Sequence, residues 1–180
     1  MDDKIVECIP NFSEGRNQAV IDEISKAASS VEGARLINVN VEPSYNRCVH
    51  TIVGTPDAVI EATFRACAKA VELIDMNKHQ GEHPRIGAID ASPFVPVRNV
   101  TLDDCVEYAN RLGQRVAEEL KVPVYLYEAA ARKPERVKLQ NIRHPEYEGL
   151  KDLIGLPEWK PDFGEPLMHP TAGAMPLGVR

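Results

Sequence analysis

The sequence lacks the features of membrane-spanning and secreted proteins. No run of about 18 apolar residues occurs, so no segment is predicted to cross a bilayer. Met1 is followed by Asp2, Asp3 and Lys4, which is not the basic-then-apolar layout of a secretory signal. We therefore expect a cytoplasmic protein.

Cysteine is scarce and irregularly placed. Cys8, Cys48, Cys67 and Cys105 lie far apart in apolar stretches, and no two of them have the Cys-x-x-Cys spacing of a zinc site. Buried structural thiols are the favoured interpretation. We therefore predict neither a metal site nor a disulfide framework.

Basic clusters and phosphate-binding loops are also missing. The formal net charge is −6, and the cations do not gather into a long run, which argues against non-specific binding to nucleic acid. Neither a P-loop nor a Gly-x-Gly-x-x-Gly motif indicates a nucleotide site. Any anionic ligand has to be bound by individual cations.

What the sequence does contain is a globular pattern of strands and helices. Its 180 residues, 43% of them apolar, fit one domain with its own core, residues 1–180. Apolar spacing predicts strands over residues 4–10, 35–41, 48–54, 86–97 and 122–127, and helices over 17–32, 55–74 and 101–120. This order predicts an α/β (α+β) fold. We expect a mixed β-sheet in a ferredoxin-like, split βαβ arrangement, with helices on one face and the other face uncovered.

The second predicted strand has a clear alternation. Ile37, Val39 and Val41 are predicted to share one face, with Leu36 on the other. This strand and the following one, 48–54, are expected to pair in antiparallel fashion.

The last third of the chain has a weaker pattern. From Glu128, residues 128–139 indicate a basic helix or turn, and residues 145–153 indicate a short helical piece. The residues after Trp159 are rich in proline and glycine without periodicity, which is typical of a tail.

The stretch best suited to chemistry is 75–98, which contains His79 and His83. Their spacing suggests two metal ligands on one helical face. However, Gly81 lies between them and Pro84 follows His83, which disfavours a helix. A loop is the better interpretation, and the strand that follows gives His83 a fixed support.

Several motifs resemble those of a known family. They are ECIPNFSEG (7–15), PSYNR (43–47), LIDMNKHQGEHPRIGAIDASPFVPV (73–97), VPVYLYE (122–128) and EWKPDFG (158–164). Together they span nearly the whole chain, which resembles the N-terminal subdomain of the glutamate formiminotransferase (formiminotransferase-cyclodeaminase) family. The resemblance implies transfer of the formimino group of N-formiminoglutamate to N5 of tetrahydrofolate, with release of glutamate and without a metal.

The resemblance also implies which residues form the site. His83, in the GEHP motif, corresponds to the catalytic acid and base. The folate-binding segment, within a C-terminal loop and linker of residues 164–180, corresponds to Gly164, Glu165, Pro166, Leu167, Met168, His169, Pro170, Thr171, Ala172 and Gly173. The implied substrate-binding residues are Asn11, Asn40, Arg47 and Arg85. The family commonly has aspartate at the position of Asn40, so this chain keeps hydrogen bonding there without the charge.

An imidazole suits the implied reaction. The attacking N5 must lose a proton and the departing glutamate nitrogen must gain one, and a histidine titrates near neutral pH. The carboxylates of both substrates require cations, for which Arg47, Lys78, Arg85 and Arg98 are candidates.

Other polar residues leave alternatives open. His79 is either solvated or a supporting group, and His50 is a strand residue that is packed or hydrogen-bonded. Asp90 either orients a histidine or pairs with an arginine. His144 is expected at the surface, and His169 lies in the implied folate segment, where it either binds the ligand or does not.

Two other functions remain open. One is a non-catalytic folate-binding subunit, and the other is a 5-formyltetrahydrofolate cyclo-ligase, against which the missing phosphate loop argues weakly. Family enzymes hold folate between this subdomain and a second one. We therefore expect the uncovered sheet face to bind either another copy of the chain, as a homo-oligomer, or a separate chain that carries the second subdomain.

Overall fold

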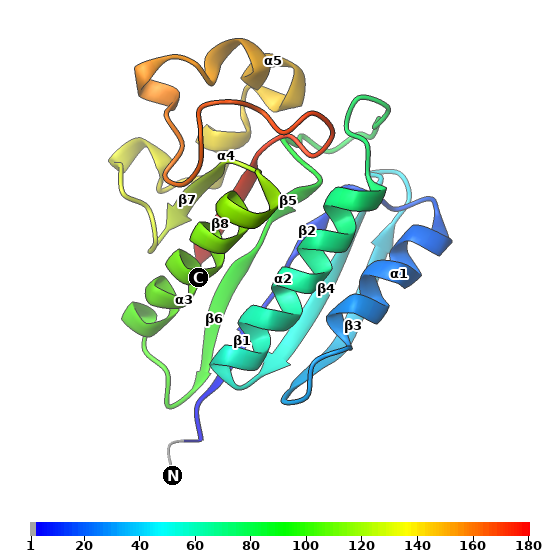
Figure 1. Cartoon of the computed structure of the whole chain (residues 1–180), viewed down its shortest axis with the longest axis vertical. Helices are drawn as coiled ribbons and strands as arrows, with labels where there is room; N and C mark the ends of the chain where they lie inside the picture. Colours follow the sequence, from blue (N-terminus) through cyan, green and yellow to red (C-terminus); the bar gives the residue numbers. More distant parts are fainter. Residues whose placement is uncertain (1–2) are drawn as a thin grey trace.

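The computed structural model describes residues 3–180 and has a mixed sheet behind three long helices (Figure 1). Its strands are β1 (Ile5–Cys8), β2 (Asn11–Phe12), β3 (Ala34–Glu42), β4 (Arg47–Gly54), β5 (Ile89–Ala91), β6 (Pro93–Arg98), β7 (Val124–Glu128) and β8 (Met175–Val179). Within the described residues they form one sheet in the order β5-β2-β4-β1-β6-β8-β7, with β3 paired to β4. The antiparallel part β3-β4-β1-β6 has the split βαβ arrangement, which confirms the predicted fold class.

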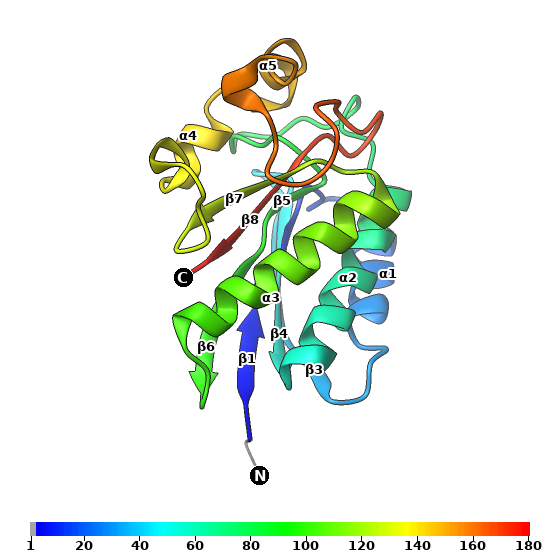
Figure 2. The ribbon, with the colours of Figure 1, turned by 60° about the vertical axis from the view of Figure 1, so that its left-hand side comes forward.

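Three helices cover one face of this sheet, as Figure 2 shows from the side. They are α1 (Gln18–Ala28), α2 (Pro56–Leu73) and α3 (Leu102–Arg115), which continues as the π-helical turn η1 (Val116–Leu120). The Asn17 side chain accepts from the Ala19 N–H at 3.1 Å, and Thr101 and Asp104 form a capping box at α3. Among residues 3–180, none of the helices has the length and apolarity required to cross a membrane.

Two helix ends differ from the prediction. α1 ends at Ala28 and not near Gly33, and the hydroxyls of Ser29 and Ser30 donate to carbonyls of its last turn. The helix predicted over 101–120 changes from α to π geometry at Val116. Neither change alters which face of the sheet is covered.

Within residues 3–180, the opposite face is covered only at the β7 end. There lie α4 (Leu139–Arg143), α5 (Glu146–Leu153) and the short turns η2 (Pro134–Arg136) and η3 (Pro157–Trp159) (Figure 2). Tyr125 and Tyr127 of β7 pack on this side with Ile142 and Leu150, while the alternate residues of β7 join the main core. The prediction of helices on one face therefore holds for the three long helices, and the two short ones are the exception.

β3 contains a bulge. The pairing register with β4 shifts between Leu36 and Asn38, which leaves the Ile37 side chain 59% exposed. Leu36 instead packs against the core with Val39 and Val41. The prediction that Ile37 shares a face with Val39 and Val41 is therefore wrong, because a bulge inserts one residue and reverses the alternation beyond it.

Two predicted strands end or break next to a proline. Of residues 4–10, only Ile5–Cys8 form a strand, β1, and the separate strand β2 follows Pro10. Residues 86–97 form β5 and then β6, which starts at Pro93. Neither proline has an N–H to donate, and their carbonyls accept from the backbone N–H groups of His50 and Ile9. β2, which follows Pro10, pairs with β5, which precedes Pro93. This pair borders the loop that contains His83.

The Pro- and Gly-rich C-terminus is not a tail. Its end forms β8, which runs parallel to both β6 and β7 and is buried along its whole length. Gly178 allows this packing, since a Cβ there would lie 2.5 Å from the ring of Tyr127. Strand periodicity did not reveal β8, because a strand covered on both faces shows no alternation of polar and apolar residues.

Replacing Leu177 of β8 with alanine is expected to lower the free energy of unfolding by about 2–5 kcal/mol, because the change leaves a cavity in the core. Leu167→Ala is the matched control: its side chain is 72% exposed, and its replacement should change stability by less than about 0.5 kcal/mol. Urea unfolding monitored by circular dichroism measures both. Equally small effects would contradict the burial of β8.

Candidate functional site

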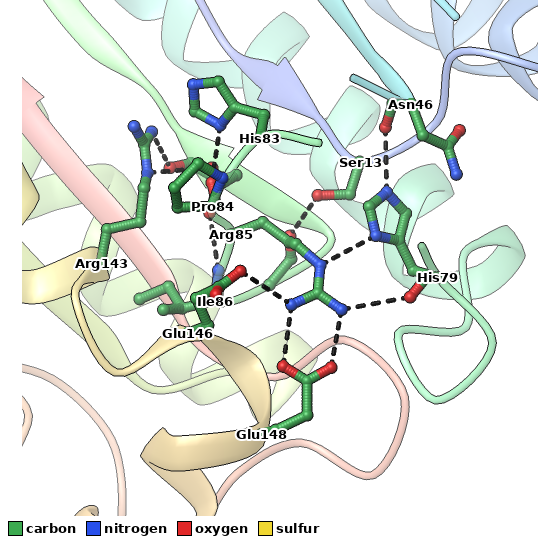
Figure 3. A network of polar contacts seen from close by, with 12 residues as sticks. Ser13, Asn46, His79, His83, Pro84, Arg85, Ile86, Arg143, Glu146 and Glu148 are labelled. Carbon is green, nitrogen blue, oxygen red and sulfur yellow. Dashed lines mark hydrogen bonds and ion pairs between the residues drawn. The ribbon is translucent and has the colours of Figure 1, made fainter. Parts of the chain in front are cut away.

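The stretch that contains both histidines is a loop held by two other chain segments (Figure 3). Asn46, in the turn between β3 and β4, accepts from the Gly15 N–H at 2.8 Å and donates to the Gln80 carbonyl at 3.0 Å. Gly81 lies so close to Tyr45 that a Cβ would be 2.3 Å from its carbonyl oxygen. The predicted loop is confirmed, and its backbone is fixed from both sides.

His79 is buried and joins these segments. Its Nε2 lies 2.9 Å from the Asn46 carbonyl oxygen, and its Nδ1 accepts from Nε of Arg85 at 3.0 Å. A carbonyl can only accept and a guanidinium can only donate, so the ring is neutral with its proton on Nε2. Burial lowers the pKa of His79, which also favours the neutral ring. His79 is therefore a supporting group and not a solvated one.

Arg85 is fully occupied by partners within the chain. Glu148 accepts from its Nη1 and Nη2 at 2.9 and 2.7 Å, and Glu146 accepts from Nη1 at 3.4 Å. His79 accepts at its ring and at its main-chain oxygen, the latter at 3.1 Å. The side chain of Arg85 therefore has no free donor for a substrate carboxylate in this structure. It connects the loop to α5.

His83 is half-buried, and its ring points away from Arg85 (Figure 3). Nδ1 lies 2.6 Å from the Pro84 carbonyl oxygen and 3.2 Å from Nη1 of Arg47. One partner only accepts and the other only donates, so Nδ1 satisfies one of them at a time. Burial, and then the charge of Arg47, lower the pKa of His83. The ring therefore stays neutral to a lower pH than a free histidine.

A buried carboxylate, Asp90, fixes the two arginines near His83. Its Oδ2 lies 2.6 Å from Nη1 of Arg47 and 3.0 Å from Nε of Arg143, and its Oδ1 accepts from the Ile86 N–H at 2.8 Å. The Asp90 side chain is 0% exposed. Of the two roles that the sequence left open, Asp90 has the role of an arginine partner.

A cavity of about 630 Å³ opens beside His83. It is lined by His83, Pro84, Gln140, Asn141, Arg143, His144 and Glu146. The wall facing the loop therefore comes from α4 and the start of α5. Sequence reasoning did not assign Arg143 or Glu146 to the site, because the weak pattern of their segment does not indicate against which part of the fold it packs. The one available signal was a dense group of charges.

Asn11 and Asn40 lie on the same strand face. Both are paired with Val49 of β4, from opposite sides. Asn11 accepts from Nε of Arg47 at 3.2 Å, which connects it to His83. Asn40 is exposed and donates to Glu42 at 3.3 Å. The structure thus brings Asn11 and Arg47 together with His83, and it places Asn40 on β3, outside the residues that line the cavity.

The implied folate segment lines a different cavity. Gly164, Glu165 and the residues from Leu167 to Pro170 form one wall of a space of about 480 Å³. The other wall comes from α3, η1, Lys121, Pro123 and Phe163. His169 Nδ1 accepts from the N–H groups of Thr171 and Ala172, so its Nε2 carries the proton.

Backbone hydrogen bonds connect the end of this segment to the His83 loop. The carbonyls of Thr171 and Ala172 accept from the N–H groups of Met76 and Ala88 at 2.7 and 2.9 Å. The segment therefore supports the loop, although it does not line the His83 cavity.

The remaining candidates lie elsewhere. Lys78 is exposed on the loop, and Arg98 is at the far end of β6, where it donates to the Asp3 carbonyl. His50 is in the core with Nε2 2.8 Å from the Ser25 hydroxyl, and burial lowers its pKa to about 4. His144 is exposed, as predicted.

The thiols follow the prediction. Cys8, Cys48, Cys67 and Cys105 are buried and free. Burial raises the pKa of Cys8 to about 12, so this thiol is not reactive near neutral pH. In the part of the chain from residue 3 onward, no cluster of three His, Cys, Asp or Glu side chains is placed to hold a metal ion.

The fold and the site define a class of protein: an α+β subdomain whose conformationally fixed loop presents a histidine, flanked by buried arginines, to a cavity. The chain belongs to the formiminotransferase family. The family model described as "Formiminotransferase domain, N-terminal subdomain" matches residues 5–180. The resemblance seen in the sequence motifs is thereby confirmed.

Three relatives illustrate the similarity, and each aligns over 98% of this chain. The chain is 52% identical to formimidoyltransferase-cyclodeaminase of Rattus norvegicus, of which the match covers 33%. It is 46% identical to glutamate formimidoyltransferase of Streptococcus pyogenes serotype M1 and 45% identical to that of Thermoplasma acidophilum, covering 59% and 58% of them. The chain thus spans between a third and three-fifths of the length of these relatives.

Replacing Asp90 with asparagine is expected to lower the free energy of unfolding by about 3–5 kcal/mol, because two largely buried guanidinium groups lose their counter-charge. Asp57→Asn is the control. Asp57 also pairs with an arginine, Arg111, but its side chain is 85% exposed, so the loss should stay below about 1 kcal/mol. Urea titration compares the two variants, and equal losses would show that the Asp90 pairs contribute little.

Proposed function

We propose that this chain acts in glutamate formimidoyl transfer, in which the formimino group of N-formiminoglutamate moves to N5 of tetrahydrofolate and L-glutamate is released. The names of the relatives support this reaction. The observation that carries the proposal for this chain is the position of His83: a half-buried imidazole with lowered pKa in the wall of a cavity.

His83 would act as general base and then as general acid. With Nδ1–H donating to the Pro84 carbonyl, Nε2 is free to accept a proton. Nε2 takes the proton that the attacking nitrogen loses as the new C–N bond forms. It returns that proton to the glutamate nitrogen as the old C–N bond breaks. Positioned proton transfer of this kind is typically worth about 10²–10⁴ in rate.

Arginines near His83 would bind the substrate carboxylates. Arg47 and Arg143 both contact Asp90, and this carboxylate offsets part of their combined charge. The remaining positive charge favours anions at the site. Asn11 is held by Arg47 and Asn40 is exposed on the same sheet face, so we retain both as proposed substrate contacts. Arg85 would act indirectly, by fixing the loop.

Tetrahydrofolate is the proposed co-substrate and, when bound, supplies N5 as the accepting nitrogen. The cavity lined by residues Gly164–Pro170 has an apolar wall of Phe163, Leu167 and Met168, which fits a flat heteroaromatic ring. His169 Nε2–H and Lys121 add hydrogen-bond donors there. We propose that this segment, through Gly173, contributes the folate contacts of the chain.

A second candidate function is folate binding without turnover. The observation that favours it is that the segment Gly164–Pro170 and His83 line separate cavities. A partner, either a second copy or a chain with the second subdomain, would then complete the site. We propose the uncovered sheet face, with the half-buried Val49 and Val53, as its contact surface. A cytoplasmic location stays a prediction from the sequence.

Replacing His83 with alanine is expected to reduce folate-dependent glutamate release by about 10²–10⁴-fold, because the reaction loses its proton carrier. The urea unfolding midpoint should hardly change, since the ring is half-exposed. Imidazole added to the variant should restore part of the rate, because the cavity beside residue 83 has room for it. Full activity of the variant would contradict the role of His83. Tetrahydrofolate binding by the unaltered chain without any turnover would select the second function.

The pH profile gives an independent test. Since the pKa of His83 is lowered, the acidic limb of kcat/KM is expected below pH 6.5, the ordinary pKa of histidine. Arg47→Gln removes a charge that disfavours the imidazolium, so the pKa should rise and the limb should move to higher pH. Arg98→Gln, at the far end of β6, should leave the limb in place. A limb that does not respond to Arg47→Gln would show that it does not report His83.

A further inference from the structure

Glu146 has an unusual backbone conformation for its residue type. Its φ is +56°, in the left-handed region that favours glycine, and it is the first residue of α5. Non-glycine residues in this region cost conformational free energy, and they cluster at functional sites. Glycine at this position would favour folding, so the fold does not explain why glutamate is present.

The Glu146 carboxylate is also not needed to hold Arg85. Glu148 already binds that guanidinium at 2.7 and 2.9 Å, whereas Glu146 lies at 3.4 Å. The Tyr147 N–H donates to the Arg85 carbonyl at 2.8 Å, which fixes the backbone independently of the Glu146 side chain. That side chain is 47% exposed, and Oε2 has no hydrogen-bond partner among residues 3–180.

Glu146 lines the same cavity as His83. It is the one carboxylate among the residues that line this space in the described chain, and the others include Arg143, Gln140 and Asn141. The cavity therefore combines a carboxylate, a guanidinium and neutral amides next to a proton carrier. This set of charges fits a small ligand that has both a cationic group and carboxylates.

The formimino donor has these charges. Its amidine is protonated near neutral pH, and the planar amidinium presents two N–H donors that match the two oxygens of a carboxylate. We propose that Glu146 binds this amidinium, holds the reacting carbon beside His83 and makes the chain select a formimino donor over a neutral formyl donor. This inference rests on the proposed function.

The test measures selectivity in binding and does not depend on turnover. Isothermal titration compares N-formiminoglutamate with N-formylglutamate, which has the same shape but an uncharged oxygen in place of the cationic nitrogen. Glu146→Gln keeps the shape of the side chain and removes its charge. We expect it to weaken binding of N-formiminoglutamate by about tenfold to a hundredfold and to leave N-formylglutamate nearly unchanged.

Two further variants separate charge from structure. Glu146→Gly should show the same loss of selectivity together with a higher unfolding midpoint, because the strained conformation is relieved. Glu148→Gln weakens the other contact of Arg85 and lies outside the residues that line the cavity. It should keep the preference for the formimino ligand, even if it weakens the binding of both ligands.

The outcomes distinguish the two proposals. If the chain releases glutamate but Glu146→Gln keeps the full preference for the formimino ligand, the role of Glu146 is wrong and the proposed function stands. If Glu146→Gln weakens both ligands equally, the residue is structural and the inference fails. If the unaltered chain neither binds N-formiminoglutamate nor releases glutamate, both the proposed function and the inference are overturned.

Discussion

The site depends on one buried carboxylate. Asp90 is the middle residue of β5. It binds Arg47 from β4, Arg143 from α4 and the backbone N–H of Ile86. These groups come from three separate parts of the chain. Because an unpaired buried charge is costly, the carboxylate forces the hairpin, the loop and α4 to meet at one point. The cavity beside His83 exists where they meet.

The same ion pairs determine the electrostatics at His83. Two guanidinium groups share one carboxylate, so a positive charge remains close to the imidazole. That charge opposes protonation of His83, while the Pro84 carbonyl favours it by accepting from Nδ1. Burial is the larger cause of the lowered pKa, and the charge of the arginines adds to it. A network that holds the fold together thus also lowers the proton affinity of the proposed catalytic group.

The sequence predicted whatever depends on local pattern. The helix starts near Asn17 and Thr101, the split βαβ order and the loop around His83 all follow from short-range signals, and the structure confirms them. It did not predict β8, which is buried on both faces and therefore shows no alternation, or the bulge at Ile37. The position of Arg143 at the site was not predicted for a related reason. Its partner, Asp90, is distant in sequence, and pairing between distant residues produces no periodic pattern.

Charged residues next to a histidine do not by themselves indicate ligand contacts. Arg85 is only two positions from His83, yet its donors all bind Glu146, Glu148 and His79. In sequence it looked like a ligand-binding cation, and in the structure it is a connector. The opposite holds for Glu146. Its carboxylate makes one long hydrogen bond to Arg85, which Glu148 already binds, so it contributes little to the fold. Whether a charge serves the fold or a ligand is therefore decided by how many of its hydrogen-bonding atoms the chain itself already satisfies.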